Sequence, residues 1–191
     1  MNKKMLRLAL AGAICFCAST AVVPASAADM KAPTTVTREP GKSMVLTMRD
    51  VASIFTEKYA DTAIHSIALK PEKGQFAYQV VGYSMKKTYT ANIDIITGKI
   101  LKESEGGKER DLMQKIFNPN QVIDQQQAQA VAVTAIGEGA VSKAWELSAD
   151  RGLVTYVVTV HQGMERTDVT INAKDGSVMA IGEPSEVKIE D

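Results

Sequence analysis

The chain has 191 residues, of which 45% are hydrophobic and 5% aromatic, and its 22 basic residues balance 22 acidic ones. This length suits one ordinary domain or two small ones, and the composition is typical of a folded globular protein with a mostly aliphatic core. The balanced charge leaves no excess of basic residues to form a basic face, which argues against a nucleic-acid partner.

Residues 1–27 have the features of a secretory signal peptide. Three basic residues lie within the first seven positions, an apolar run follows over residues 8–23, and Ala25-Ser26-Ala27 matches a cleavage site. Pro24 ends the apolar run before it reaches the roughly 20 residues that a transmembrane helix needs. We therefore predict an exported protein, periplasmic or extracellular, with no stable membrane insertion after cleavage. An uncleaved anchor stays open as the alternative.

Both cysteines, Cys15 and Cys17, lie inside this apolar run. A lipoprotein signal needs a small residue directly before the cysteine, whereas Ile14 and Phe16 stand there. Cleavage would leave a mature chain with no thiol and a net charge of −3, because it removes three basic residues and no acidic ones. Disulfides and cysteine-ligated metals are therefore not expected in the mature protein.

The segment after the signal peptide, residues 28–43, contains two prolines and few large apolar side chains, so we predict a flexible N-terminal segment. A helix is predicted from Thr47 to about Ala60 or Asp61, because Thr47 and Asp50 can form a capping box and apolar residues follow at helical spacing. Strands are predicted at residues 63–70, 75–83, 87–96 and 99–103. Their connections are too short for crossover helices, so neighbouring strands must be antiparallel.

The second half of the chain repeats this order. Asp124 and Gln127 can form a second capping box, and Gly137 is a suitable left-handed stop for the helix that follows. The two halves align with a shift of 77 residues in the helix and 78 in the strands, which indicates a duplicated unit. The predicted strands of this half lie at residues 140–148, 152–162, 165–172 and 177–182.

We predict an α+β fold of two tandem units, each with one helix packed on a three- to four-stranded antiparallel sheet. The first unit covers residues 44–103 and the second residues 123–185, followed by a C-terminal tail at residues 186–191. Residues 104–122 form a linker, in which the apolar residues between positions 112 and 117 favour a short helix that docks at the junction. One unit alone would have a marginal core, whereas two packed together bury more of the chain.

The first unit ends in the pattern D-x-x-T-G-K-I at residues 94–100, after a capped helix and a long strand with a central tyrosine. This arrangement resembles the PepSY domain. The second unit departs from the pattern, because Asn172, Asp175 and Ser177 stand for its aspartate, threonine and lysine. PepSY modules occur in the propeptides of metallopeptidases, where they help folding and restrain activity. The resemblance therefore implies an envelope protein that binds or restrains a protease or cell-wall enzyme in trans.

The sequence contains no motif that anchors the usual metal-dependent or nucleophilic catalysis, such as H-E-x-x-H, G-x-S-x-G or a Walker loop. His65 and His161 lie near the ends of predicted strands, where an ordinary surface histidine is the simpler interpretation. Asp94, Asp168 and Asp175 could in principle join a calcium site, but Thr-Gly and Asp-Gly are typical of tight hairpin turns. We therefore expect no catalytic site, no metal and no cofactor.

The alternation of the strands predicts two different faces for each sheet. Phe76, Tyr78 and Val80 are expected to lie under the first helix. The opposite faces are rich in threonine and amide side chains and poor in charge, which a solvated face explains without any function. We hypothesise that these faces join into one protein-binding surface, because a few apolar residues add contact area to them. The candidate residues are Gln79, Tyr83, Thr90, Asn92, Thr155, Val157, Thr159, His161 and Thr170.

We therefore expect an exported, non-enzymatic binding protein that inhibits or regulates an envelope or secreted protein, such as a protease or a cell-wall hydrolase. The alternative is a module that binds a small ligand or a wall polymer in the cleft between the two units. An enzyme would need a catalytic constellation that the sequence does not provide.

Overall fold

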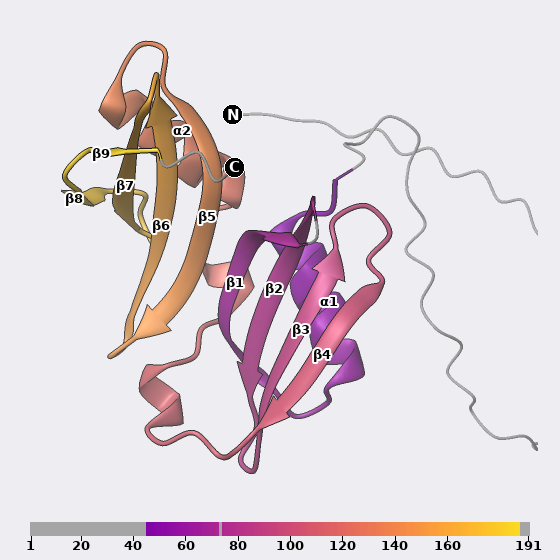
Figure 1. Cartoon of the computed structure of the whole chain (residues 1–191). Helices are drawn as coiled ribbons and strands as arrows, with labels where there is room; N and C mark the ends of the chain where they lie inside the picture. The colour runs from indigo at the N-terminus through magenta and orange to yellow at the C-terminus, as the bar shows by residue number, and fades with distance from the viewer. Residues whose placement is uncertain (1–44, 73, 188–191) are drawn as a thin grey trace, which may run out of the picture. The chain divides into compact units, whose positions relative to one another are not determined.

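The computed structural model describes residues 45–72 and 74–187. The predicted signal peptide (1–27), the predicted flexible segment (28–43) and residues 188–191 of the predicted tail lie outside the described residues. Helix and strands follow one another twice along the chain, with a linker in between (Figure 1). The elements are α1 (Met48–Lys58), β1 (Ala63–Glu72), β2 (Gln75–Tyr83), β3 (Thr88–Asp94), β4 (Ile100–Gly106), the 3-10 turns η1 (Leu112–Gln114) and η2 (Pro119–Gln121), α2 (Gln125–Ile136), β5 (Val141–Asp150), β6 (Leu153–Gln162), β7 (Glu165–Asn172), β8 (Val178–Ile181) and β9 (Ser185–Glu186).

The described strands form a single antiparallel sheet in the order β4-β3-β2-β1-β5-β6-β7-β8, with β9 beside β7. The α+β class and the antiparallel neighbours predicted from the sequence are confirmed. A separate sheet in each unit was predicted, and here the structure differs, because β1 pairs with β5 from Ser66 opposite Ser148 to Leu69 opposite Trp145. This junction between β1 and β5 is called the seam below. It satisfies backbone groups that would otherwise form an open edge in each repeat.

One hydrophobic core lies between the two helices and one face of the sheet. Ile67 and Leu147 face each other across the seam, and both side chains are fully buried. Residues from both repeats belong to the same core cluster, so the two repeats share their buried apolar surface. The largest fully buried side chains are Tyr156, Phe55, Met48, Ile67, Ile93, Leu147, Ile171, Val51, Val80, Val158, Val160 and Val169. Neither described helix has the length and apolarity needed to cross a membrane.

Tyr78 and Val80 of β2 are buried as predicted, but the prediction that Phe76 on the same face lies under the helix is wrong. Tyr78 and Val80 are buried, whereas Phe76 is 47% exposed. The hydroxyl of Tyr78 donates a hydrogen bond to the carbonyl of Leu46, which stands just before the cap of α1, so Tyr78 already lies at the start of that helix. Phe76 is two residues closer to the β1–β2 turn and therefore lies beyond the first turn of α1.

In each repeat, a buried tyrosine holds the residue that leads into the helix. Tyr78 Oη donates a hydrogen bond to the Leu46 carbonyl at 2.8 Å, and Tyr156 Oη donates to the Ile123 carbonyl at 2.8 Å. The backbone amides of both lead residues also donate 2.8 Å hydrogen bonds, to the carbonyls that directly follow β3 and β7. Each helix is therefore attached to the sheet by buried or partly buried hydrogen bonds as well as by packing.

The helix caps follow the prediction in part. At α1 the full capping box forms, because Asp50 accepts from the Thr47 amide at 2.8 Å and Thr47 accepts from the Asp50 amide at 3.2 Å. At α2 only the first half is present, in which Asp124 accepts from the Gln127 amide at 2.8 Å. Helix α1 ends at Lys58, earlier than predicted, and the chain then turns through a left-handed residue, Asp61.

The linker contains the 3-10 turn η1 where a short docked helix was predicted. Met113 in this turn is 84% exposed, so it does not dock on the core. Backbone hydrogen bonds attach the linker to both repeats instead: Phe117 donates to the Ile64 carbonyl at 2.9 Å, and the Gln114 carbonyl accepts from the Gly152 amide at 2.8 Å.

Replacing Ile67 by alanine is expected to lower the free energy of unfolding by about 2–5 kcal/mol, because it leaves a cavity at the seam. Since both repeats share one core, unfolding should remain a single transition. Urea denaturation followed by Trp145 fluorescence and by circular dichroism should therefore give one shifted midpoint. The matched control is Leu153→Ala, whose side chain is 44% exposed. Two separate transitions, of which the one followed by Trp145 fluorescence keeps its midpoint in Ile67→Ala, would show that the repeats unfold independently.

Burial raises the pKa of Tyr78 from its ordinary value of 10.0 to about 12, and the Asp50 carboxylate adds to the shift. The stability contributed by neutral Tyr78 is fully present below pH 10 and is lost as the pH rises to about 12, because the unfolded state releases this proton first. Over that window, the free energy of unfolding should fall less steeply with pH in Tyr78→Phe than in the parent chain. The two slopes should differ by up to about 1.4 kcal/mol per pH unit. Urea denaturation at a series of alkaline pH values measures this slope, and equal slopes in the two proteins would contradict the expectation.

Candidate protein-binding face

The face of the sheet opposite the helices, called the open face, carries a row of side chains that crosses every strand from β4 to β8. Each member of this central row is the register partner of the next. The row consists of Lys102, Asn92, Gln79, Ala68, Glu146, Val157, Thr170 and Ala180. Ala68 and Glu146 are equivalent positions in the two repeats and pair directly across the seam. An approximate two-fold axis therefore passes between them, and the duplication relates the two halves of the row.

Several predicted binding residues belong to this central row: Gln79 and Asn92 from the first repeat, and Val157 and Thr170 from the second. The duplication makes Gln79 equivalent to Val157 and Asn92 equivalent to Thr170. The structure therefore brings together, on one continuous sheet, positions that the sequence placed in two separate units.

The next row on one side of the centre contains Thr90 and Thr155. It consists of Ser104, Thr90, Val81, Ser66, Ser148, Thr155 and Asn172, and hydroxyl groups dominate it. On the other side of the centre, Thr159 lies opposite Asp168 and donates a 2.6 Å hydrogen bond to it. Tyr83 and His161, at the ends of β2 and β6, are equivalent positions and lie far from the row centre in opposite directions along the strands.

Two of the predicted binding residues are buried. Asn92 is 8% exposed, and its side-chain oxygen accepts a hydrogen bond from Gln79 Nε2 at 3.4 Å. Tyr83 is 9% exposed, and its ring stacks on the ring of His65 with 4.8 Å between centroids. Both side chains therefore have little surface to offer a partner in this conformation. The other predicted residues are partly buried, as side chains on a sheet face flanked by neighbours usually are.

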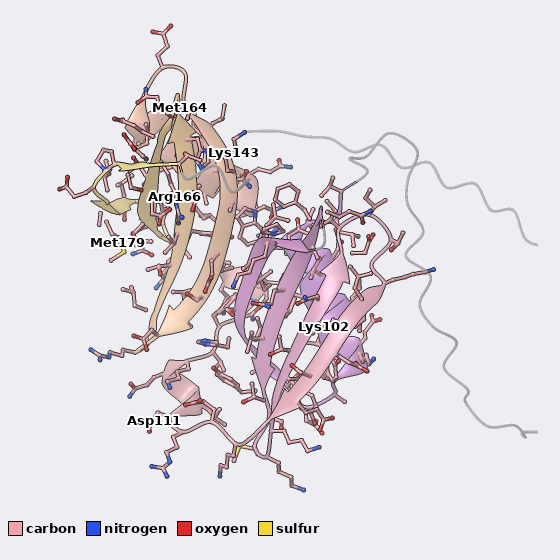
Figure 2. All side chains as sticks on the ribbon, in the orientation of Figure 1. Lys102, Asp111, Lys143, Met164, Arg166 and Met179 are labelled. Atoms are coloured by element: carbon pink, nitrogen blue, oxygen red, sulfur yellow. The ribbon has the colours of Figure 1, made fainter. Side chains whose placement is uncertain are left out.

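The charges on the open face are mostly paired with one another. Lys70 Nζ donates to Gln79 Oε1 at 3.0 Å and lies 3.8 Å from Glu146 Oε2 across the seam. Arg166 pairs with Asp168 at 3.0 Å. Figure 2 labels Lys102 on the first repeat and Arg166 on the second. A partner that covered the centre of the face would therefore bury few unpaired charges, as is typical of the core of a protein interface.

The sequence interpretation missed the residues of the seam. Ser66 and Ser148 pair directly, as do Ala68 and Glu146, and these residues form the middle of the open face. Nothing in the alternation of β1 or β5 shows that the two strands are neighbours. The duplication itself is the one signal that points to the seam, because two similar units with open edges of the same kind can pair edge to edge.

The Asp94 turn between β3 and β4 has a structural role, as predicted. Asp94 Oδ1 accepts from the Thr97 amide at 2.6 Å, from the Thr97 hydroxyl at 2.8 Å and from the Ile96 amide at 3.0 Å, and these hydrogen bonds hold the pKa of the carboxyl below its usual range. In the second repeat Asp175 accepts from the amide and hydroxyl of Ser177, so the turn survives the change of motif. Among the described residues, no cluster of histidine, cysteine and acidic side chains could hold a metal ion.

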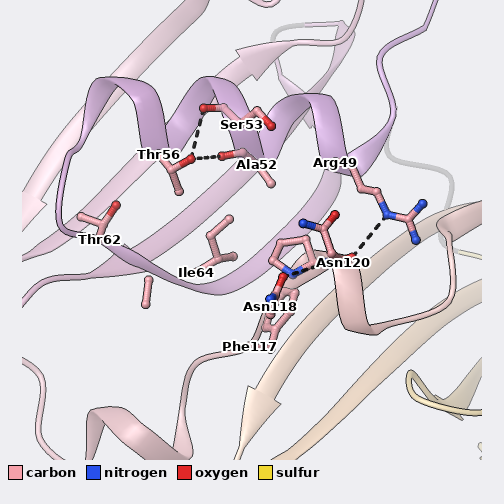
Figure 3. Close-up of a pocket in the computed structure, with 11 residues that line it drawn as sticks. Arg49, Ala52, Ser53, Thr56, Thr62, Ile64, Phe117, Asn118 and Asn120 are labelled. Carbon is pink, nitrogen blue, oxygen red and sulfur yellow. Dashed lines mark hydrogen bonds between the residues drawn. The ribbon is translucent and has the colours of Figure 1, made fainter.

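Pockets with volumes typical of small-ligand sites lie next to the linker. One of about 310 Å³ lies between α1 and the chain before and within η2 (Figure 3). Its polar wall includes Arg49, which donates a long 3.4 Å hydrogen bond to the Pro119 carbonyl, and Asn118, which accepts from the Asn120 amide at 2.9 Å. Thr56 donates into its own helix, so its hydroxyl is already used. A second pocket, of about 730 Å³, lies between the linker and β6.

The fold defines a class of module in which a capped helix packs on an antiparallel sheet and the whole unit is repeated in tandem. The D-x-x-T-G turn closes the first unit, and the related turn at Asp175 closes the second. Residues 45–103 and 122–181 each match the PepSY family, described as "Peptidase propeptide and YPEB domain". The chain belongs to the PepSY family and carries two tandem copies of its domain.

A similar fold is known from a crystal structure of a "putative lipoprotein" from Clostridium difficile 630. The two chains superpose with a TM-score of 0.66 at 23% sequence identity, over 76% of this chain and 97% of the other. At this identity the likeness shows the fold. No curated protein matches the chain.

Alanine at Gly98 is expected to destabilise the protein more than alanine at Gly176. Both glycines have a positive φ, +72° and +78°, which costs an L residue roughly 1–2 kcal/mol. At Gly98 the added Cβ would also lie 2.8 Å from Ile54 Cδ1, whereas at Gly176 the nearest atom is 3.5 Å away. The difference should be on the order of 1 kcal/mol, because Ile54 must shift.

Urea denaturation of the two variants measures this difference in the free energy of unfolding. The double variant Gly98→Ala/Ile54→Val, which removes the opposing methyl group, should recover part of the loss. An equal loss at both glycines would show that the close approach of α1 to this turn contributes nothing.

Proposed function

We propose that this PepSY protein is an exported, non-enzymatic binding protein that inhibits or regulates a protease or another cell-envelope enzyme through its open face. The observation that carries the proposal is the seam, which makes one continuous face from the two repeats. In two separate sheets the predicted residues would be divided between two small surfaces.

The size of the open face suits a protein partner. Neighbouring strands are about 4.8 Å apart, so the strands from β4 to β8 span roughly 34 Å, and five or six residues along a strand add roughly 18 Å. The projected area of roughly 600 Å² approaches the approximately 800 Å² that each partner contributes to a standard interface. A small ligand would use only a fraction of this area.

The chemistry of the open face also supports a protein partner. Hydroxyl and amide groups supply hydrogen-bonding positions, Val81 and Val157 supply apolar contact, and the main charges are paired. Such a mixture is typical of non-obligate protein interfaces. The predicted signal peptide would place the protein among periplasmic or extracellular enzymes. Because the description of the PepSY family names peptidase propeptides, a protease or wall hydrolase is the first partner to test.

The alternative function is binding of a small ligand or a wall polymer, for which the sequence predicted the cleft between the two units. Because the seam joins the two repeats in one sheet, the pockets next to the linker are the candidate places for such a ligand. The pockets of about 310 Å³ and about 730 Å³ favour it, because both lie where the linker contacts the repeats. A ligand bound there should raise the melting temperature by mass action and should be insensitive to changes on the open face.

The double variant Thr90→Arg/Thr159→Arg should lose its enzyme partner while remaining folded. Both threonines lie on the open face, one on each side of the central row, and two long cations there would block close contact. The purified chain, residues 28–191, is used to capture proteases or hydrolases from the envelope fraction. We expect the double variant to retain at least tenfold less enzyme than the parent chain. The captured enzyme should then be inhibited or altered in activity by the parent chain and not by the variant.

The matched control is Thr56→Arg/Thr134→Arg, which adds the same charge on exposed positions of α1 and α2. Capture that is lost equally in both double variants would be an effect of net charge and would count against the open face. If a well-folded parent chain retains no enzyme, the proposed function is overturned and the ligand-binding alternative is favoured.

A further inference from the structure

A largely apolar pocket of about 740 Å³ lies beside the β2–β3 hairpin and the first part of the linker. Its volume is within the range of roughly 300–1,000 Å³ that is typical of small-ligand sites. The apolar lining consists of Tyr83, Met85, Leu112, Met113 and Ile116. Met113 and Met85 are the most exposed of the large hydrophobic side chains in the described chain, at 84% and 72%. Flexible thioether side chains of this kind adapt readily to the shape of an apolar ligand.

The wall that the linker gives to this pocket is fixed from several sides. The Lys115 carbonyl lies 2.7 Å from His65 Nδ1, and Lys115 Nζ forms an ion pair of 2.7 Å with Glu109. The His65 ring stacks in turn on Tyr83, which lines the pocket, and the linker then continues into the backbone hydrogen bond of Phe117 with β1. These contacts fix this wall before any ligand arrives, so binding would order mainly the exposed methionine side chains.

Backbone strain is concentrated at the same pocket. In the described chain, the non-glycine residues with a positive φ are Asp61 at 63°, Asp111 at 58° and Arg151 at 49°. Asp61 and Asp111 both line the pocket, although they come from different segments. Residues in such sparsely populated conformations cluster at functional sites, where the surrounding structure keeps them in place.

The second repeat does not carry the same arrangement at its equivalent hairpin. Gly163 stands at the position of Met85, and His161 at that of Tyr83. Gln162 Nε2 also donates a 2.7 Å hydrogen bond to the Glu138 carbonyl, which ties this hairpin to the end of α2. The apolar pocket is therefore a feature of the first repeat and its linker, and the duplicated fold alone does not explain it.

The rim of the pocket carries cations that are not used inside the protein. Lys108 and Arg110 line the pocket, and Lys86 follows Met85 on the hairpin. Among the ion pairs of the described residues, none involves these three side chains, whereas the carboxylate between them in sequence, Glu109, is engaged by a lysine of the linker.

We infer that this pocket binds a soluble, single-chain amphiphilic anion, with its alkyl chain between Met85 and Met113 and its carboxylate or phosphate group near Lys108 and Arg110. Asp61 and Asp111 also line the pocket and take part in none of these ion pairs, so two carboxylates stand against the three cations. The preference for an anion over a neutral head group should therefore be a few-fold rather than absolute. This site is distinct from the central row of the open face and does not depend on the proposed protein partner.

The test is calorimetric titration of the full mature chain with dodecanoate and dodecyl phosphate, below their micelle-forming concentrations. We expect saturable binding at one site, with a rise in melting temperature that follows ligand concentration. Dodecyl maltoside and dodecyltrimethylammonium should bind several-fold more weakly. The Thr90→Arg/Thr159→Arg variant should bind dodecanoate like the parent chain, which separates this site from the open face.

Met85→Ser/Met113→Ser should weaken dodecanoate binding at least tenfold without unfolding the protein, because both side chains are exposed. The matched control Met164→Ser/Met179→Ser removes exposed methionines of the second repeat, at 61% and 48%, and should leave binding unchanged. Lys108→Gln/Arg110→Gln should abolish the preference for anions and keep the weaker binding of dodecyl maltoside.

Several outcomes would overturn the inference. Titration could show no saturable binding to a folded chain, binding that survives Met85→Ser/Met113→Ser, or equal binding of neutral and anionic amphiphiles by the parent chain. Binding to phosphatidylglycerol vesicles in the absence of binding to the soluble amphiphiles would also overturn it, because it would assign the surface to a bilayer.

Discussion

The hydrogen bond from a buried tyrosine to the residue that leads into each helix is the interaction on which both repeats depend. Tyr78 and Tyr156 reach Leu46 and Ile123 from the middle of the sheet, and the same two lead residues are also hydrogen-bonded through their amides. Away from bulk water such bonds are stronger, and leaving any of their buried polar groups unpaired would be costly. They fix where each helix starts, and the start of the helix decides which strand residues it covers.

The open face follows from that placement. With the helices fixed on one side, strand alternation leaves the opposite side to solvent, and the register at the seam sets Ala68 beside Glu146. A slip of one residue at the seam would turn the side chain of either Ile67 or Leu147 out of the core, so burial of both side chains specifies the register. The same constraint that stabilises the core therefore also orders the rows of side chains on the open face.

The sequence allowed most elements to be predicted, because period-two alternation and capping residues are local signals. Strands β2 and β7 have the bounds that were predicted, and the Thr47 cap formed in full. The seam could not be predicted from strand alternation, because Ser66 to Leu69 show the same alternation whether β1 lies at an edge or in the centre of a sheet. The pocket at the linker was also missed, since it depends on the left-handed backbone of Asp111 and on contacts between segments far apart in sequence.

The seam gives the tandem chain a property that a pair of identical subunits lacks. A single repeat would expose β1 as an unpaired edge and could complete its sheet only by associating with another copy, whereas the linker holds the second repeat at an effective concentration of about millimolar or more. A dimer of identical subunits must present the same residues on both sides of its two-fold axis. Covalent fusion has released the halves from that symmetry, and Lys102 and Ala180, Gln79 and Val157 now differ at matching positions. A near-symmetric scaffold thereby presents a directional surface, on which a partner has one preferred orientation.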